Sequence, residues 1–496
     1  MIPPDLADAD DRVSHVLEFM SRPVASNAEG ELMTLRLHLA ELAALPVSIN
    51  QFHRILDLFQ ARIDGLWSTA MKRLSVARRP LANEIVGLAE SLDDIEAQVF
   101  DGYLRVLRDV EQRLVRNRRR DPALVAGRAL KALRDRLILA AYLSRAAPRE
   151  LWSEAHRLFG LACGDRPFDQ TQALGERDAR RIYREMLAFS TAQPERLSGP
   201  EIAAAADYVA RYAPTVVVLD AAPEQMDYRL FWFAAQFDMA PVAIARRIPD
   251  PRAEIVYFSC ERMGTLAVEH ARALEEGATP ASLLLPPGMD TPRLRALLQR
   301  LHETWAEPPT RHLMRRRQHY QVQMVIGLPA IAQRLENPNE DGLSLWDVRD
   351  ESPAGYALTH HSGQIGSLTP GEVVAIRGDA AKPWDICVVR RALAQGTGPA
   401  QVGLQVLGSG ARAVKIAFRH VNAEGNTAHQ VLWLPALPVI RSRNAILVPT
   451  GIAGSTRFVM VSSNGRTQVT QGRIVSQDLQ TATIEVFQFE DDPYPI

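Results

Sequence analysis

Three short runs, EVVAIRG (372–378), WDICVVRRAL (384–393) and QVGLQVLG (401–408), decide the fold of the last third of the chain. Each run is rich in Val, Ile and Leu, and Gly, Pro and polar residues separate each run from the next. This pattern is typical of the strands of a small barrel. The earlier run VQMVIGL (322–328) has the same character, so we predict a β-barrel that, with the segment before it, covers residues 306–410.

The residues after 410 also have the composition of short strands. They predict a further β unit over 411–496, which would be an extension of the barrel or a second barrel. The runs that carry this prediction are HQVLWLP (429–435), AILVPT (445–450), RFVMVSS (457–463), RIVSQ (473–477) and TIEVFQF (483–489).

The residues before the barrel have a different periodicity. From about Asp11 to Ser190, apolar residues recur at i, i+3 and i+4, which indicates packed amphipathic helices. Further on, strand-like runs such as VVVLD (216–220) alternate with helical patterns such as MGTLAVEHARALEEG (263–277). We therefore predict a multidomain α+β protein. Its parts are an irregular all-helical bundle over 1–190, a mixed α/β segment over 191–305, a β-barrel with a basic N-terminal hinge over 306–410 and a C-terminal β extension over 411–496.

The composition of the chain argues against several classes of protein. Lys+Arg 57 and Asp+Glu 58 give a net charge of -1, without the basic excess of a general nucleic-acid binder, so we expect no DNA or RNA partner. The three cysteines lie far apart without CxxC spacing, so we expect neither a disulfide framework nor a zinc site. The acidic N-terminus has no secretory pattern, and no run approaches the roughly 18 apolar residues of a membrane span. We therefore expect a cytoplasmic protein.

Enzyme motifs are absent from the sequence. The P-loop, dinucleotide-binding, zinc-protease and serine-hydrolase patterns do not occur. We therefore predict that the protein is not an enzyme and that it needs neither a metal ion nor an organic cofactor.

Two polar signals flank the first predicted strand of the barrel. RHLMRRRQHY (311–320) is an arginine cluster directly before that strand, and DESPAG (350–355) follows further along the chain as D-x-S-x-x-G. In this order the two signals resemble the PilZ domain family, and the resemblance covers about residues 311–410. Later strands agree with the family pattern in GEVVAI (371–376), WDICVVRR (384–391) and VGLQVL (402–407).

PilZ domains are bacterial receptors for the second messenger cyclic di-GMP. The resemblance therefore implies a cyclic di-GMP-binding regulator, with this nucleotide as its ligand. The helical N-terminal region would then be the output or partner-binding module, and its protein partner is not identified by the sequence.

The family motif R-x-x-x-R fits the arginine cluster in two registers. Arg311 and Arg315 have the required spacing but lie well before the strand. In the register nearer the strand, Arg316 is the first arginine, Arg315 and Arg317 stand beside it, and Tyr320 replaces the second arginine. Guanidinium pairs bidentately with phosphate, whereas tyrosine can stack on guanine but cannot neutralise a phosphate. The alternative to a nucleotide receptor is therefore a PilZ-like protein-interaction scaffold that has lost nucleotide binding.

The D-x-S-x-x-G stretch also has the chemistry of a guanine nucleotide site. Asp350 can accept hydrogen bonds from the N–H groups of a guanine edge, and Ser352 offers a hydroxyl near a phosphate. We expect the stretch to be a connecting turn in which Gly355 has a positive φ and lets the backbone approach the ligand. A turn without ligand would need the same residue types, so this alternative stays open.

Overall fold

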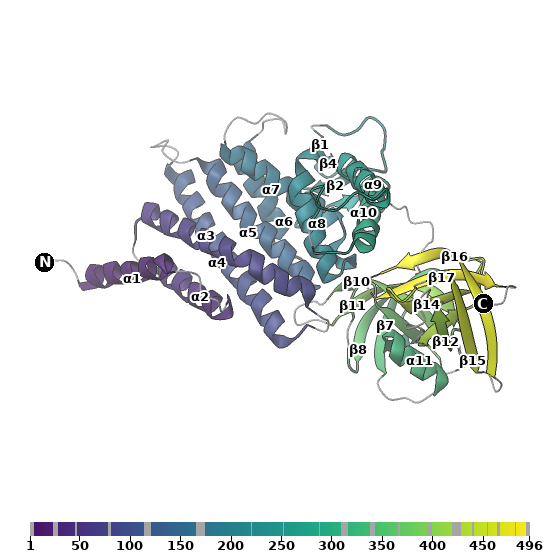
Figure 1. Cartoon of the computed structure of the whole chain (residues 1–496). Helices are drawn as coiled ribbons and strands as arrows, with labels where there is room; N and C mark the ends of the chain where they lie inside the picture. Colours follow the sequence, from purple (N-terminus) through teal and green to yellow (C-terminus); the bar gives the residue numbers. More distant parts are fainter. Residues whose placement is uncertain are drawn as a thin grey trace. The chain divides into compact units, whose positions relative to one another are not determined.

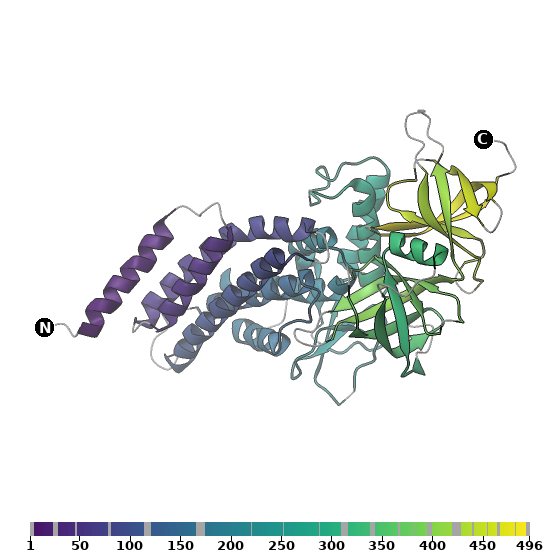
Figure 2. The ribbon, with the colours of Figure 1, turned by 90° about the horizontal axis from the view of Figure 1, so that it is seen from below.

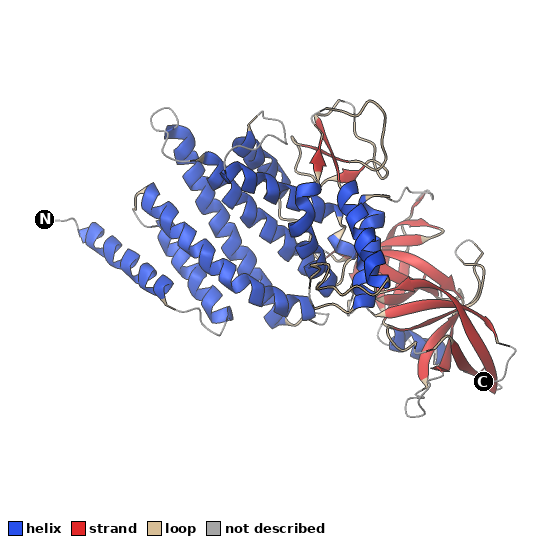
Figure 3. Cartoon of the chain, turned by 45° about the horizontal axis from the view of Figure 1, so that its top comes forward, coloured by secondary structure: helices blue, strands red, loops and turns tan. Residues whose placement is uncertain are grey.

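The chain folds as two compact units, and each is described here by itself (Figure 1). The first consists of Met1–Pro194 and Gly199–Thr310, and the second of Glu195–Ser198 and Arg311–Ile496. Helices dominate the first unit and strands the second (Figure 3). The structure, a computed structural model, describes residues 4–22, 28–44, 47–77, 81–113, 121–164, 174–219, 221–250, 252–286, 288–308, 316–337, 343–365, 368–379, 381–393, 399–418, 428–438, 441–453, 455–463, 467–481 and 483–492.

Packed helices make up most of the first unit, which confirms the helical N-terminal region (Figure 2). They are α1 (Pro4–Ser21), α2 (Ala28–Ala44), α3 (Ile49–Val76), α4 (Asn83–Arg113), α5 (Pro122–Tyr142), α6 (Leu151–Cys163), α7 (Leu174–Thr191) and α8 (Gly199–Tyr212). Local signals place their starts. Ser48 and Gln51 form a capping box before α3, and Asp121 accepts a hydrogen bond from the Ala123 N–H at the start of α5.

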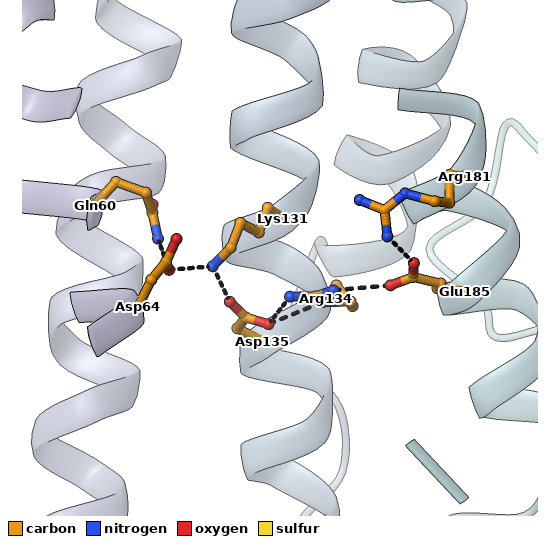
Figure 4. A network of polar contacts seen from close by, with 7 residues as sticks. All are labelled: Gln60, Asp64, Lys131, Arg134, Asp135, Arg181 and Glu185. Carbon is orange, nitrogen blue, oxygen red and sulfur yellow. Dashed lines mark hydrogen bonds and ion pairs between the residues drawn. The ribbon is translucent and has the colours of Figure 1, made fainter. Parts of the chain in front are cut away.

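A chain of charged side chains crosses the interior of the helical region (Figure 4). Lys131 Nζ on α5 lies 2.6 Å from Asp64 Oδ1 on α3 and 2.7 Å from Asp135 Oδ2. Arg134 Nη1 extends the chain to Glu185 Oε2 on α7, at 2.8 Å. Because Asp135 is fully buried, removing one partner would leave an uncompensated charge inside the bundle. The network therefore holds α3, α5 and α7 in a fixed arrangement.

A small antiparallel sheet and two helices complete the first unit. The strand order is β1-β4-β2-β3. The elements are β1 (Val217–Val218), β2 (Phe231–Ala234), β3 (Val242–Ala243), β4 (Ile255–Ser259), α9 (Glu261–Glu275) and α10 (Thr291–Trp305). Asp238, between β2 and β3, accepts hydrogen bonds from the Trp152 and Ser153 N–H groups at 2.9 and 3.4 Å. This side chain therefore caps α6 and ties the small sheet to the bundle.

The second unit begins with a closed antiparallel barrel. Its strands are β6 (Gln321–Ile326), β7 (Ser344–Ser352), β8 (Gly355–Ser362), β9 (Val373–Arg377), β10 (Asp385–Leu393) and β11 (Gln401–Ser409). They follow the order β7-β6-β9-β10-β11-β8, and pairing of β7 with β8 closes the ring. The two-residue strand β5 (Arg316–Arg317) pairs with the end of β7. The core of this first barrel includes Trp346, Val348, Val374 and Cys387, all fully buried.

The C-terminal residues form a second closed barrel. Its strands are β12 (Arg412–Phe418), β13 (His429–Leu434), β14 (Ala445–Pro449), β15 (Arg457–Ser463), β16 (Thr467–Gln480) and β17 (Ile484–Asp491), in the order β12-β13-β14-β17-β16-β15. Of the two alternatives that the sequence left open, the structure therefore has a second barrel. The predicted multidomain α+β class, with a helical N-terminal region followed by β-barrels, is confirmed.

The two barrels share one hydrophobic core. Helix α11 (Leu328–Glu336), which sequence analysis did not predict, connects β6 and β7 and contributes Ile331. The outer face of the first barrel contributes Ile386, and the second barrel contributes Leu432 and Leu447, all fully buried in the same cluster. Separating the barrels would expose this core, so each stabilises the other.

Candidate functional site

The D-x-S-x-x-G stretch is a tight β-hairpin. Asp350 and Ser352 lie at the end of β7, Gly355 begins β8, and only two residues connect the strands. Ser352 pairs directly with Gly355, and its Oγ lies 3.4 Å from the Gly355 carbonyl oxygen. The expectation that Asp350 and Ser352 lie in a connecting turn is therefore wrong, because both belong to β7 and the turn consists of Pro353 and Ala354. The motif side chains stand on regular strand backbone, whose pairing fixes their direction.

Gly355 is required for a different reason from the one expected. Its φ is not positive, so the predicted left-handed conformation is wrong. A Cβ atom at this position would instead lie 2.2 Å from the carbonyl oxygen of Leu404 on β11. Glycine therefore lets β8 and β11 approach closely at the end of the barrel.

A β-bulge divides the residues around the motif between the two faces of β7. Val348 points into the barrel, and the register then shifts between Val348 and Asp350. After the shift, Glu351 pairs with Tyr356, which packs against the interior of the barrel. Residues paired across an antiparallel ladder share a face, so Glu351 faces the interior side, whereas Asp350 and Ser352 face outward.

Strand β5 distributes its two arginines in the same way. Arg317 pairs with Asp350 and Arg316 pairs with Glu351, and both arginine residues are exposed. Arg317 therefore shares the outer face with Asp350, and Arg316 lies on the opposite face. Arg311 and Arg315, which belong to the other register of the arginine motif, lie outside the described residues.

Tyr320 also belongs to the interior side. Its hydroxyl donates a hydrogen bond to Glu351 Oε2 at 2.5 Å, and the residue is 39% exposed. Burial, followed by the hydrogen bond to Glu351, raises the pKa of the Tyr320 phenol well above its ordinary value. The side chain is therefore a neutral donor, and it points away from the face that carries Arg317, Asp350 and Ser352.

A pocket opens at this end of the barrel, and we call it the barrel-mouth pocket. It encloses about 220 Å³ and is lined by Tyr320, Val322, Tyr356, Ile376, Arg377, Gly378, Lys382, Pro383, Asp385 and Ser409. The Tyr356 hydroxyl donates to Asp385 Oδ2 at 2.9 Å. Burial, and then the charge of Asp385, raise the pKa of Tyr356, so this phenol is also neutral. Sequence reasoning missed Glu351, Tyr356 and Asp385, although Glu351 and Tyr356 stand within and next to the motif.

Two other kinds of site are absent from the described ranges. No group of three or more His, Cys, Asp and Glu side chains there is placed to hold a metal ion. Within the same ranges, no helix combines the length and the apolar character that a membrane crossing requires.

A closed antiparallel barrel whose D-x-S-x-x-G hairpin pairs with an arginine strand agrees with the PilZ resemblance and defines the class of protein. Residues 14–223 match the family model of the N-terminal domain of the cyclic-di-GMP receptor FimW, and residues 333–413 match that of its middle PilZ domain. These ranges together cover more than half of the chain, which belongs to this family of cyclic di-GMP receptors. The PilZ match includes the D-x-S-x-x-G hairpin but begins after the arginine cluster. No curated protein matches the chain.

Proposed function

We propose that this chain binds cyclic di-GMP at the end of the first barrel and uses the bound nucleotide to regulate a protein partner. The observation that carries the proposal is the pairing of β5 with β7, which sets Arg317 opposite Asp350 on the outer face. A guanidinium supplies a cation for phosphate, and a carboxylate beside it accepts from guanine N–H groups. Ser352 adds a hydroxyl on the same face.

The other arginines of the cluster belong to the proposed site by proximity along the chain. Arg316 lies next to Arg317 on β5, and Arg311 and Arg315 precede it in the sequence. Nearby cations add their attraction for an anion that carries two phosphates. Gly355 supports the site indirectly, because it allows the close approach of β8 and β11 on which the hairpin depends.

The position of the site along the chain suggests how a signal would be passed on. Residue 310 ends the first unit and residue 311 begins the main part of the second, so β5 follows closely after the connection. A ligand that binds β5 would therefore act on the connecting segment. We infer that the helical N-terminal region is the output module, takes a protein partner and works in the cytoplasm without a catalytic step.

One observation favours a second candidate function, a PilZ-like scaffold without nucleotide binding. Tyr320 stands four residues after Arg316, where one register of the family motif has an arginine. Its hydroxyl is engaged by Glu351 on the interior side, so it supplies no charge for a phosphate.

Calorimetric titration of cyclic di-GMP into the full chain tests the proposal. We expect saturable binding that excess GTP does not abolish. The full chain is needed because a fragment that ends near residue 410 would lack the half of the shared core that the second barrel supplies. Absence of saturable binding would favour the scaffold.

A further inference from the structure

The barrel-mouth pocket is not part of the outer face that carries Arg317, Asp350 and Ser352. Its walls come from strands that are distant in sequence, with Tyr320 before β6, Tyr356 on β8 and Asp385 on β10. Pockets that hold a drug-sized molecule have roughly 300–1,000 Å³. The barrel-mouth pocket, with about 220 Å³, is smaller and is suited to one portion of a larger ligand.

We propose that the barrel-mouth pocket is a guanine subsite that receives one base of cyclic di-GMP. This inference rests on the proposed function and assigns one of the two guanine bases of cyclic di-GMP to this pocket. The phenol rings of Tyr320 and Tyr356 and the apolar side chains of Val322 and Ile376 provide surfaces for the flat faces of a purine.

The polar groups of the pocket select guanine over adenine. Asp385 Oδ2 accepts from the Tyr356 hydroxyl, and Oδ1 accepts no hydrogen bond from any residue in the described ranges. Guanine presents adjacent N1–H and N2 amino donors that a carboxylate can accept, whereas adenine presents an acceptor at N1. Lys382, an exposed residue on the rim, can donate to guanine O6 or N7.

The hairpin connects this pocket with the outer face. Glu351 stands between Asp350 and Ser352 in sequence, but the bulge turns it toward Tyr320. Arg316, opposite Glu351, is on the same side as the pocket, and Arg317 is on the outer face. A ligand with two guanines and two phosphates therefore meets a carboxylate and an arginine on each side of the strand end.

Isosteric replacement of Asp385 tests the guanine subsite. Asp385→Asn keeps the shape of the side chain but places an amide where the carboxylate would accept from guanine. We expect cyclic di-GMP affinity for the full chain to fall at least about tenfold and the preference over cyclic di-AMP to narrow. Asp379→Asn is the matched control, because Asp379 lies in the connection that precedes β10 but does not line the pocket.

Lys382→Gln provides a variant at an exposed position, where loss of the fold is not a concern. It should weaken cyclic di-GMP binding about threefold or more through the lost cation. Wild-type affinity in both Asp385→Asn and Lys382→Gln would overturn the subsite alone, provided that Asp350→Ala still weakens binding. Absence of cyclic di-GMP binding by the wild-type chain would overturn the proposed function and the subsite together.

Discussion

Replacing Asp350 with Ala should weaken cyclic di-GMP binding and leave the fold intact. Asp350 is half-buried, and its backbone is paired with β5 on one side and with β8 on the other. Asp and Ala are both depleted in strands, so the free energy of unfolding should change by less than about 1 kcal/mol. The position therefore allows a binding contact to be removed without loss of the barrel.

The loss of binding should be larger than the loss of stability. A hydrogen bond to a charged group contributes about 1.5–3 kcal/mol, which corresponds to about a tenfold to hundredfold change in Kd. Arg317 stays opposite position 350 in the variant and can still attract a phosphate, so part of the binding contact remains. We therefore expect a weakening near the lower limit, about tenfold.

Calorimetric titrations of the wild type, Asp350→Ala and Asp347→Ala provide the measurement. Asp347 is the matched control, because it lies on the same strand and loses the same charge. Its contacts are with Gln321 and His361 rather than with the arginine strand. Equal Kd values for all three proteins would refute the assignment of Asp350 to the ligand site.

Three further predictions concern stability. Gly355→Ala should lower the free energy of unfolding by about 1–3 kcal/mol, because the new Cβ would clash with the Leu404 carbonyl oxygen. Melting curves should show no such loss for the control Gly160→Ala, because a Cβ at position 160 meets nothing within 4 Å. Leu447→Ala should lower the free energy of unfolding by about 2–5 kcal/mol. Because Leu447 belongs to the core that the two barrels share, both barrels should unfold in one denaturant transition, and two separate transitions would contradict this prediction. Burial lowers the pKa of His156 to about 4, so the unfolded chain binds the extra proton as the pH falls. The free energy of unfolding, measured by denaturant titration, should therefore fall by about 2 kcal/mol between about pH 7 and pH 5. The variant His156→Gln should not show this fall.

The barrel strands with a strong apolar pattern could be predicted from the sequence. EVVAIRG, WDICVVRRAL and QVGLQVLG correspond to β9, β10 and β11, because the apolar side chains of these strands pack into two cores. Helix α11 was missed because its nine residues are too few to establish a helical period. Strands β7 and β8 were missed because charged and polar residues occupy their exposed faces and only a two-residue loop separates them.

The candidate site could be predicted in composition but not in arrangement. The order of Arg317, Asp350 and Ser352 along the chain suggested a shared ligand, and strand pairing places these three on one face. The bulge after Val348 shifts the alternation by one residue, so a strict period of two cannot assign the face of Glu351. The barrel-mouth pocket forms only when the barrel closes and brings distant strands together, so no local sequence pattern predicts it.

Hydrogen–deuterium exchange of the full chain, with and without saturating cyclic di-GMP, tests the central claim most directly. We claim that the nucleotide binds where β5 meets the β7–β8 hairpin. We predict slower exchange with ligand at residues 316–320 and 349–357 and unchanged exchange in β15 and β16 of the second barrel. No slowing at the first two segments, or slowing confined to other parts of the chain, would contradict the claim.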